Sequence, residues 1–117
     1  MSFKYLQYRQ IQCEKYFLAV TKGDNCIKIG ASYFMLSNIL LDQNSSQIKL
    51  VVQRFSKVCD FFRNPLHSSY LSIVLASDLT GRFETVSLSQ VDKKLVSLPY
   101  KEQEGSFVLI PFCHDES

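Results

Sequence analysis

Residues 48–62 read IKLVVQRFSKVCDFF, and this stretch decides the fold class that the sequence predicts. Apolar residues recur along it at helical spacing, and the polar side chains fall largely on the opposite side. Asn44, three residues before Gln47, forms a polar version of the capping box that begins many helices. Pro65 ends the helix, because proline disfavours helical geometry in the residue before it. The sequence therefore predicts an amphipathic helix with one core face, formed by residues 48, 51, 52, 55, 58, 59 and 62.

Three strands are predicted before this helix. Residues 3–11 are rich in aromatic side chains, and residues 15–21 (KYFLAVT) alternate more clearly between polar and apolar. Residues 22–25 supply turn chemistry, so residues 26–31 (CIKIGA) are expected to pair back on 15–21 as a hairpin. Residues 33–41 are predicted to form a third strand, with a short buried helix as the alternative. The inward side chains of the hairpin are expected to be Tyr16, Leu18, Val20, Ile27 and Ile29.

The chain after the helix is predicted to be mostly β structure. Residues 69–76 alternate, residues 79–82 form a turn, and residues 83–88 pair back as a second hairpin. Residues 89–98 fit either a short helix or a packed loop, and residues 106–112 form the last strand. The element order is then β-β-β-α-β-β-β. This order predicts an α+β fold, an antiparallel sheet built from hairpins with one main amphipathic helix packed on one face.

Length and composition are those of a single domain. The 117 residues are 46% apolar, and we expect one domain over residues 1–113 with a frayed tail at 114–117. A net charge of only +2 argues against tight, non-specific coating of phosphates. The first twenty residues hold no apolar stretch typical of a signal peptide, and no segment reaches the length of a membrane span. We therefore expect an intracellular protein, nuclear or cytoplasmic, with reduced thiols and no membrane partner.

The sequence offers no recognisable metal or catalytic site. Its cysteines, at positions 13, 26, 59 and 113, are widely spaced, whereas structural zinc needs ligands in short pairs. Its two histidines, His67 and His114, belong to no catalytic signature. Four glycines are too few for a glycine-rich phosphate loop. The expectation is a protein without cofactor, metal or enzymatic activity.

The outward face of the predicted N-terminal hairpin is the candidate functional surface. If the inward side chains face the helix, then Lys15, Phe17 and Lys28 point outward. An exposed aromatic ring flanked by lysines is typical of sheets that bind single strands, because bases stack on the ring and amines contact phosphates. Lys22 in the turn and Arg9 on the neighbouring strand extend this patch.

The same region resembles one repeat of the PUR family of purine-rich-element binding proteins, whose architecture is similar to that of the Whirly proteins. The likeness covers residues 3–63. In that family a Lys/Arg-aromatic-aromatic strand is followed by a hairpin partner with Lys-Ile near its middle. Lys15-Tyr16-Phe17 and Ile27-Lys28-Ile29 take those places here. The resemblance implies a β-β-β-β-α repeat, in which a pair of repeats or a dimer builds the nucleic-acid surface.

The leading hypothesis is therefore a non-enzymatic domain that binds single-stranded DNA or RNA on the outer sheet face. Phe17 is expected to stack on bases, assisted by Tyr5 or Tyr33, while the basic side chains contact phosphates without reading sequence. The alternative is a module for protein–protein interaction or homodimer formation through the same aromatic surface. The predicted nucleic-acid-binding residues are Lys15, Phe17, Lys22, Lys28, Tyr5, Arg9 and Tyr33.

Overall fold

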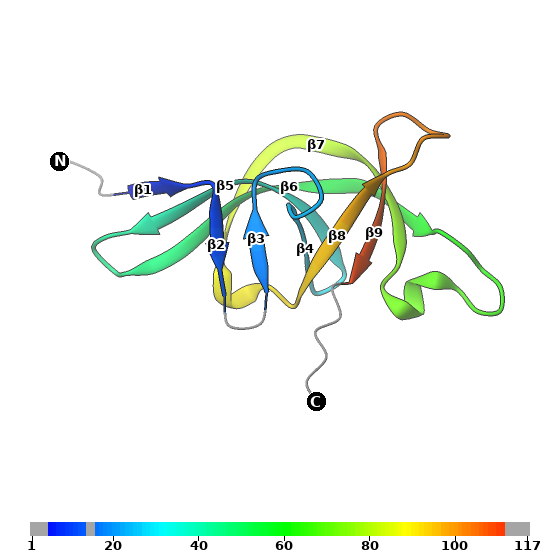
Figure 1. The fold of residues 1–117 in the computed structure, drawn as a ribbon, viewed down its shortest axis with the longest axis horizontal. Coiled ribbons are helices and arrows are strands. Elements are labelled where there is room, and N and C mark those ends of the chain that lie inside the picture. The colour runs from blue at the N-terminus through cyan, green and yellow to red at the C-terminus, as the bar shows by residue number, and fades with distance from the viewer. Residues whose placement is uncertain (1–4, 14–15, 112–117) are drawn as a thin grey trace.

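The computed structural model describes residues 5–13 and 16–111, and these residues form an almost entirely β structure (Figure 1). The strands are β1 (Tyr5–Tyr8), β2 (Gln10–Gln12), β3 (Phe17–Ala19), β4 (Cys26–Ile29), β5 (Ser32–Asp42), β6 (Gln47–Asp60), β7 (Val74–Ser87), β8 (Lys93–Pro99) and β9 (Ser106–Pro111). Two short 3-10 turns lie between strands: η1 (Ser68–Leu71) comes after β6, and η2 (Leu88–Gln90) comes after β7.

The predicted amphipathic helix is wrong, because residues 48–60 belong to the long strand β6. β6 is paired along both edges, with β5 on one side and β7 on the other. Leu50 and Val52 are buried at the two-residue spacing of a strand, but the register shifts between Gln53 and Phe55, and Phe55 is the next buried residue. This irregularity places a three-residue step in the apolar pattern, which imitates a helical period. The α+β prediction is corrected to an all-β antiparallel fold.

Six of the strands close into a ring. β4, β5, β6 and β7 follow one another as antiparallel neighbours, and β8 and β9 form a hairpin. β9 pairs with β7 and β8 pairs with β4, which closes the sheet. We call these six strands the ring. β1 adds to the far half of β5, with Leu6 opposite Leu41, and β2 pairs only with β3 as a separate two-stranded sheet.

Neither predicted hairpin forms. β3 pairs with β2, with Leu18 opposite Ile11, whereas β4 pairs with β5 and β8, so residues 15–21 and 26–31 are not strand neighbours. Residues 74–87 run as the single strand β7, bent where Asp78 and Gly81 adopt positive φ angles of 56° and 76°. The turn chemistry of residues 79–82 therefore bends one strand instead of joining two. The predicted strands at 33–41 and 106–112 are confirmed as β5 and β9.

Two apolar cores hold the molecule together. The first lies between the β2–β3 pair and one face of β4, β5 and β6, and it contains Leu18 and Ile27, with Tyr16, Val20 and Ile29 against it. The predicted inward set of five side chains is thus confirmed, although a sheet and not a helix receives it. The second core takes one or two residues from each ring strand: Cys26, Tyr33, Phe55, Val74, Ala76, Leu95 and Leu109. β4 and β5 are therefore buried on both faces.

Candidate functional site

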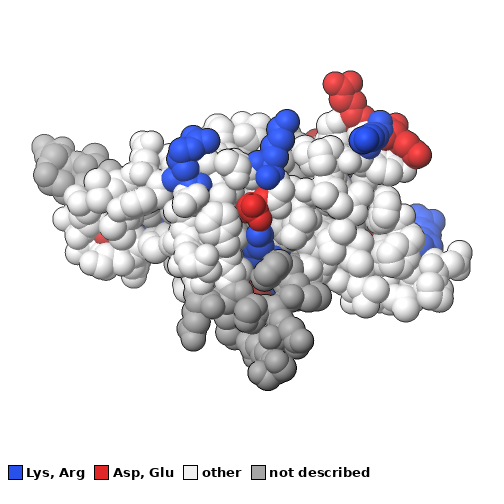
Figure 2. Space-filling model, viewed as in Figure 1, with Lys and Arg blue, Asp and Glu red and all other residues white. Residues whose placement is uncertain are grey.

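Three of the predicted nucleic-acid-binding residues lie on or beside the β2–β3 pair. Phe17 begins β3 and is partly exposed, and Arg9 and Lys22 are exposed. Arg9 adjoins the end of β3, because its carbonyl accepts a 2.8 Å hydrogen bond from the Val20 N–H. Lys15 and the side chain of Tyr5 lie outside the described part of the chain. On the face drawn in Figure 2, basic side chains do not gather into one patch, and some lie directly beside acidic side chains.

Lys28 and Tyr33 lie on the opposite side of the first core from Phe17. They face each other across the β4–β5 pair, and the Lys28 Nζ lies 5.8 Å from the centroid of the Tyr33 ring. Tyr33 is only 6% exposed and belongs to the second core, so its ring is not open for stacking. Since β3 and β4 meet across the first core, their outer faces point away from each other. The structure does not bring Phe17 and Lys28 onto one surface.

A surface that the sequence reasoning missed lies around η1. The helical pattern places Val58 on a buried face, and the predicted strand at 69–76 includes Tyr70 and Leu71, which lie in η1. Five large apolar side chains between residues 58 and 71 are exposed, and we call them the η1 surface: Tyr70 (78%), Leu71 (52%), Phe61 (42%), Val58 (40%) and Leu66 (38%). The available signal was Tyr70-Leu71, two large apolar side chains adjacent in a segment too short to bury both.

Polar contacts fix the backbone beneath this surface. The Ser68 side chain is fully buried, and its Oγ accepts hydrogen bonds from the N–H groups of Phe61 (2.7 Å) and Phe62 (3.1 Å). Asp60 accepts a 2.8 Å bond from the Ser69 N–H and lies 2.7 Å from the His67 Nδ1. These hydrogen bonds from Ser69 and His67 lower the pKa of Asp60 from 3.8 to about 2. The loop is therefore a defined platform for its exposed apolar side chains.

The Asp60–His67 contact has the geometry with which a carboxylate orients an imidazole. Here it joins the end of β6 to the loop that follows. In the described residues, no hydroxyl or thiol is hydrogen-bonded to the second ring nitrogen of His67. The neighbouring Tyr70 ring packs against the imidazole at 5.9 Å between centroids. Across residues 5–13 and 16–111, no group of three His, Cys, Asp or Glu side chains is placed to hold a metal ion.

A buried lysine makes an ion pair that links a loop to the ring. Lys94 on β8 is 5% exposed, and its Nζ lies 2.6 Å from the Asp24 Oδ1 in the loop between β3 and β4. Burying an ammonium group is costly unless it is paired, so this contact fixes the loop against the ring.

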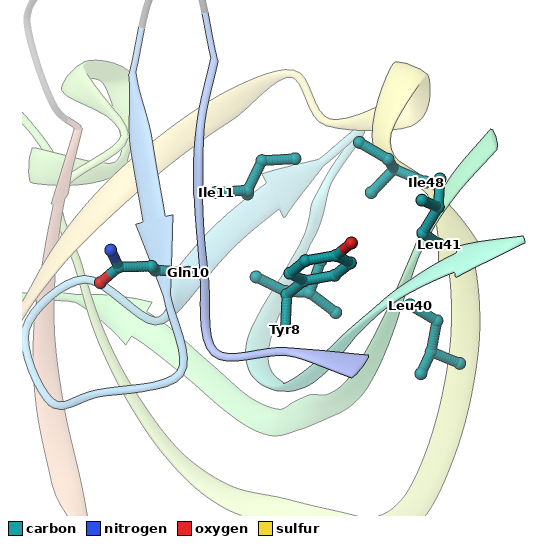
Figure 3. A pocket seen from close by; sticks show the side chains of 7 residues that line it. Tyr8, Gln10, Ile11, Leu40, Leu41 and Ile48 are labelled. Carbon is teal, nitrogen blue, oxygen red and sulfur yellow. The ribbon is translucent and has the colours of Figure 1, made fainter. Parts of the chain in front are cut away.

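An apolar hollow of about 270 Å³ lies where β1 and β2 cross the β5–β6 hairpin. Figure 3 shows the side chains of Tyr8, Ile11 and Ile48 around one space, with Leu40 directed away from it. The hollow lies beside the first core, with which it shares Ile11, Ile39 and Ile48. Its few polar groups give a ligand little to recognise. A second hollow, of about 350 Å³, opens at the end of the ring interior beside η1 and has a more polar lining, with Lys28, Asp60 and Ser69 in its wall.

Fold and surfaces together define a small all-β domain with a closed six-stranded sheet and an exposed apolar platform at one end. The chain belongs to the family described as a domain of unknown function, DUF8592, whose model matches residues 1–112. No curated protein and no solved structure matches the chain. Among the described residues, no helix has the length and apolar character needed to cross a membrane.

Proposed function

We propose that this chain is a non-enzymatic protein-interaction domain that binds its partner through the η1 surface. The observation that carries the proposal is the exposure of five large apolar side chains within residues 58–71. Exposed apolar side chains gathered in one place are characteristic of binding sites, whereas single ones scattered over a surface are ordinary. The aromatic ring of Tyr70, 78% exposed beside Leu71, is the type of side chain that anchors protein interfaces.

The platform supports this proposal because it is already formed in the free chain. Ser68 and Asp60 hold the loop through four short contacts, so partner binding orders little backbone. Arg63 lies in the same loop, is exposed, and has no carboxylate partner in the part of the chain that is described. A partner segment that combines apolar and acidic side chains fits this combination of surface and charge.

Binding of single-stranded nucleic acid is the second candidate. It is supported by Phe17, Arg9 and Lys22, which share the β2–β3 region. Three of the five side chains of the η1 surface, Val58, Leu66 and Leu71, are aliphatic. Aliphatic groups offer bases no stacking platform. With a net charge of +2, the chain has little general attraction for phosphates. Protein binding is therefore the better supported of the two.

Selection of random peptides displayed on phage, with the folded chain as bait, tests the proposal. We expect enriched peptides to combine aromatic or aliphatic residues with acidic ones. The double variant Tyr70→Ser/Leu71→Ser should bind them at least about tenfold more weakly, since anchor side chains carry most interface energy. Phe83→Ser is the matched control, because Phe83 is 60% exposed on β7, outside the η1 surface.

Three outcomes would contradict the proposal. The first is that no peptide is enriched, and the second is that enriched peptides bind the double variant as well as the unmutated chain. The third is tight binding of fluorescein-labelled single-stranded oligonucleotides, measured by anisotropy at two salt concentrations and lost in Phe17→Ala. That result would favour the nucleic-acid candidate. Sedimentation velocity over a range of concentrations shows whether the partner is a second copy of the chain.

A further inference from the structure

The side chain of Lys28 ends at the open end of the ring interior without a counter-charge. Its Nζ lies over the ring of Tyr33 and 3.5 Å from the Ser72 Oγ, which is at the limit of a hydrogen bond. Among the described residues, no carboxylate lies within ion-pair distance of this ammonium group. An ammonium group has three N–H donors, so at least two of those on Lys28 are unused.

The carboxylate in the same hollow does not neutralise Lys28. Asp60 uses Oδ1 for the N–H of Ser69 and Oδ2 for the imidazole of His67. Both contacts are short, at 2.8 and 2.7 Å, and they belong to the support of the η1 loop. Lys28 and Asp60 thus have separate environments within one hollow.

The polar groups beside Lys28 are held in position by the backbone. Ser72 ends η1 in the left-handed conformation, with φ at 61°, and is only 6% exposed. Its hydroxyl is therefore held behind Lys28, outside the lining of the hollow. Burial raises the pKa of Tyr33, whose hydroxyl is hydrogen-bonded to Ser72, so this phenol stays protonated. Lys28 and Tyr33 therefore bring N–H and O–H groups to the wall of the hollow, and the Ser72 Oγ accepts from the Lys28 Nζ.

The remaining wall is apolar. Ala31, Val58 and Val74 contribute aliphatic surface, and the hollow measures about 350 Å³. A volume of this size is at the lower end of the range of small-molecule sites, which typically pair apolar walls with a few fixed polar groups.

We propose that this hollow is a binding site for a monocarboxylate with a short apolar body, with the carboxylate on the ammonium group of Lys28, which Ser72 helps to position. One ammonium group matches one negative charge, and the Asp60 carboxylate in the wall repels a dianion such as phosphate more strongly than a monoanion. The aliphatic wall receives the apolar body of the ligand. The site goes beyond the proposed function, because the η1 surface can bind a protein whether or not this hollow is filled.

Titration of the ¹⁵N-labelled chain with sodium benzoate and sodium butyrate, followed by amide chemical shifts, tests the site. We expect saturable shifts at Lys28, Ser69 and Ser72, with inorganic phosphate binding more weakly and sodium chloride giving no saturation. An acetylated, amidated aspartate forms a separate arm, because an acidic side chain of a peptide presents the same group. Stronger binding of that compound than of benzoate identifies a peptide side chain as the source of the carboxylate.

Variants assign the effect to the hollow. Lys28→Met keeps the aliphatic stem over Tyr33 and should weaken benzoate binding at least about tenfold, the loss of one charge-assisted contact. Ser72→Gly, which tolerates the positive φ, removes the hydroxyl and provides a second test if Lys28→Met does not fold. Lys22→Met is the matched control, since Lys22 is an exposed lysine in the loop between β3 and β4.

The proposal is overturned if no carboxylate gives saturable shifts, or if the shifts persist unchanged in Lys28→Met. Phosphate binding more tightly than benzoate would overturn the assignment of a monocarboxylate. These outcomes are distinct from failure of the proposed function, because Tyr70→Ser/Leu71→Ser should weaken peptide binding at least about tenfold and leave benzoate binding intact.

Discussion

The η1 platform depends on a few individual side chains. Ser68 has no exposed surface, and its single oxygen accepts the N–H groups of two consecutive residues, Phe61 and Phe62. Asp60 performs a similar task from the end of β6, with one oxygen for the backbone of Ser69 and the other for His67. Removal of the Ser68 hydroxyl leaves two part-buried N–H groups without a partner, which is costly.

Ser68→Ala should therefore lower the free energy of unfolding by about 1–3 kcal/mol, the typical penalty for unsatisfied buried donors. Urea denaturation measures the change. Ser37→Ala is the control, since Ser37 lies exposed on β5 and should change stability by less than about 0.5 kcal/mol. Equal stability of the two variants would show that the loop does not depend on the Ser68 hydroxyl.

Asp60 should make stability depend on pH in the acid range. Its pKa is lowered from 3.8 to about 2 in the folded chain, so the unfolded chain binds the proton more readily. The stabilisation is complete above about pH 4 and is lost as the pH falls through about 2. Thermal melts from pH 5 to 2 should show a smaller decline for Asp60→Asn than for the unmutated chain. Parallel declines would mean that Asp60 has an ordinary pKa.

At the scale of elements, β6 shows what the sequence could and could not predict. β5, β9 and the inward side chains of β3 and β4 were predictable, because short apolar alternations reflect burial on one face. β6 was not, since its bulge breaks the two-residue period and its N-terminal and C-terminal halves pack differently. Strand partners were not predictable either, because pairing of β9 with β7 and of β8 with β4 depends on long-range closure of the sheet.

Leu50 and Val58 distinguish a strand from a helix in β6. The helical pattern places Val58 in the core and leaves Leu50 outside it, whereas in the structure Leu50 is fully buried and Val58 is 40% exposed. Leu50→Ala should cost about 2–5 kcal/mol of unfolding free energy, and Val58→Ala less than about 1 kcal/mol. Chemical denaturation of both variants measures the difference. A larger loss of unfolding free energy for Val58→Ala than for Leu50→Ala would favour a helix over residues 48–60.

The candidate site was predictable only in part. Exposure of Arg9 and Lys22 follows from their place in turns and at strand ends. The opposite outer faces of β3 and β4 could not be foreseen, because the two strands were assigned to one hairpin although they belong to different layers. The η1 surface was hidden for a related reason, since a helix ending at residue 62 accounts for Val58 as a core residue.

At the scale of the whole molecule, the two cores are expected to unfold together. Adjacent residues of β4 serve both, with Ile27 in the first core and Cys26 in the second, and β5 divides Phe34 and Tyr33 in the same way. Disruption of either core therefore removes the packing from one face of β4 and β5, whose other face belongs to the remaining core.

Leu18→Ala in the first core and Leu109→Ala in the second should each cost about 2–5 kcal/mol, because both side chains are fully buried. Each variant should still unfold in one cooperative transition. Far-UV circular dichroism and tyrosine near-UV signals, followed together in urea, check this. Two separate transitions in either variant would show that the cores are independent units.

The central claim is that binding takes place at the η1 end of the ring and not on the β2–β3 pair. The most direct test is to map amide chemical shifts of the ¹⁵N-labelled chain on addition of a peptide selected against it. We expect the perturbed amides to cluster in residues 58–72, with little change in residues 9–12 and 17–22. Clustering of the changes on those residues of the β2–β3 region would contradict it.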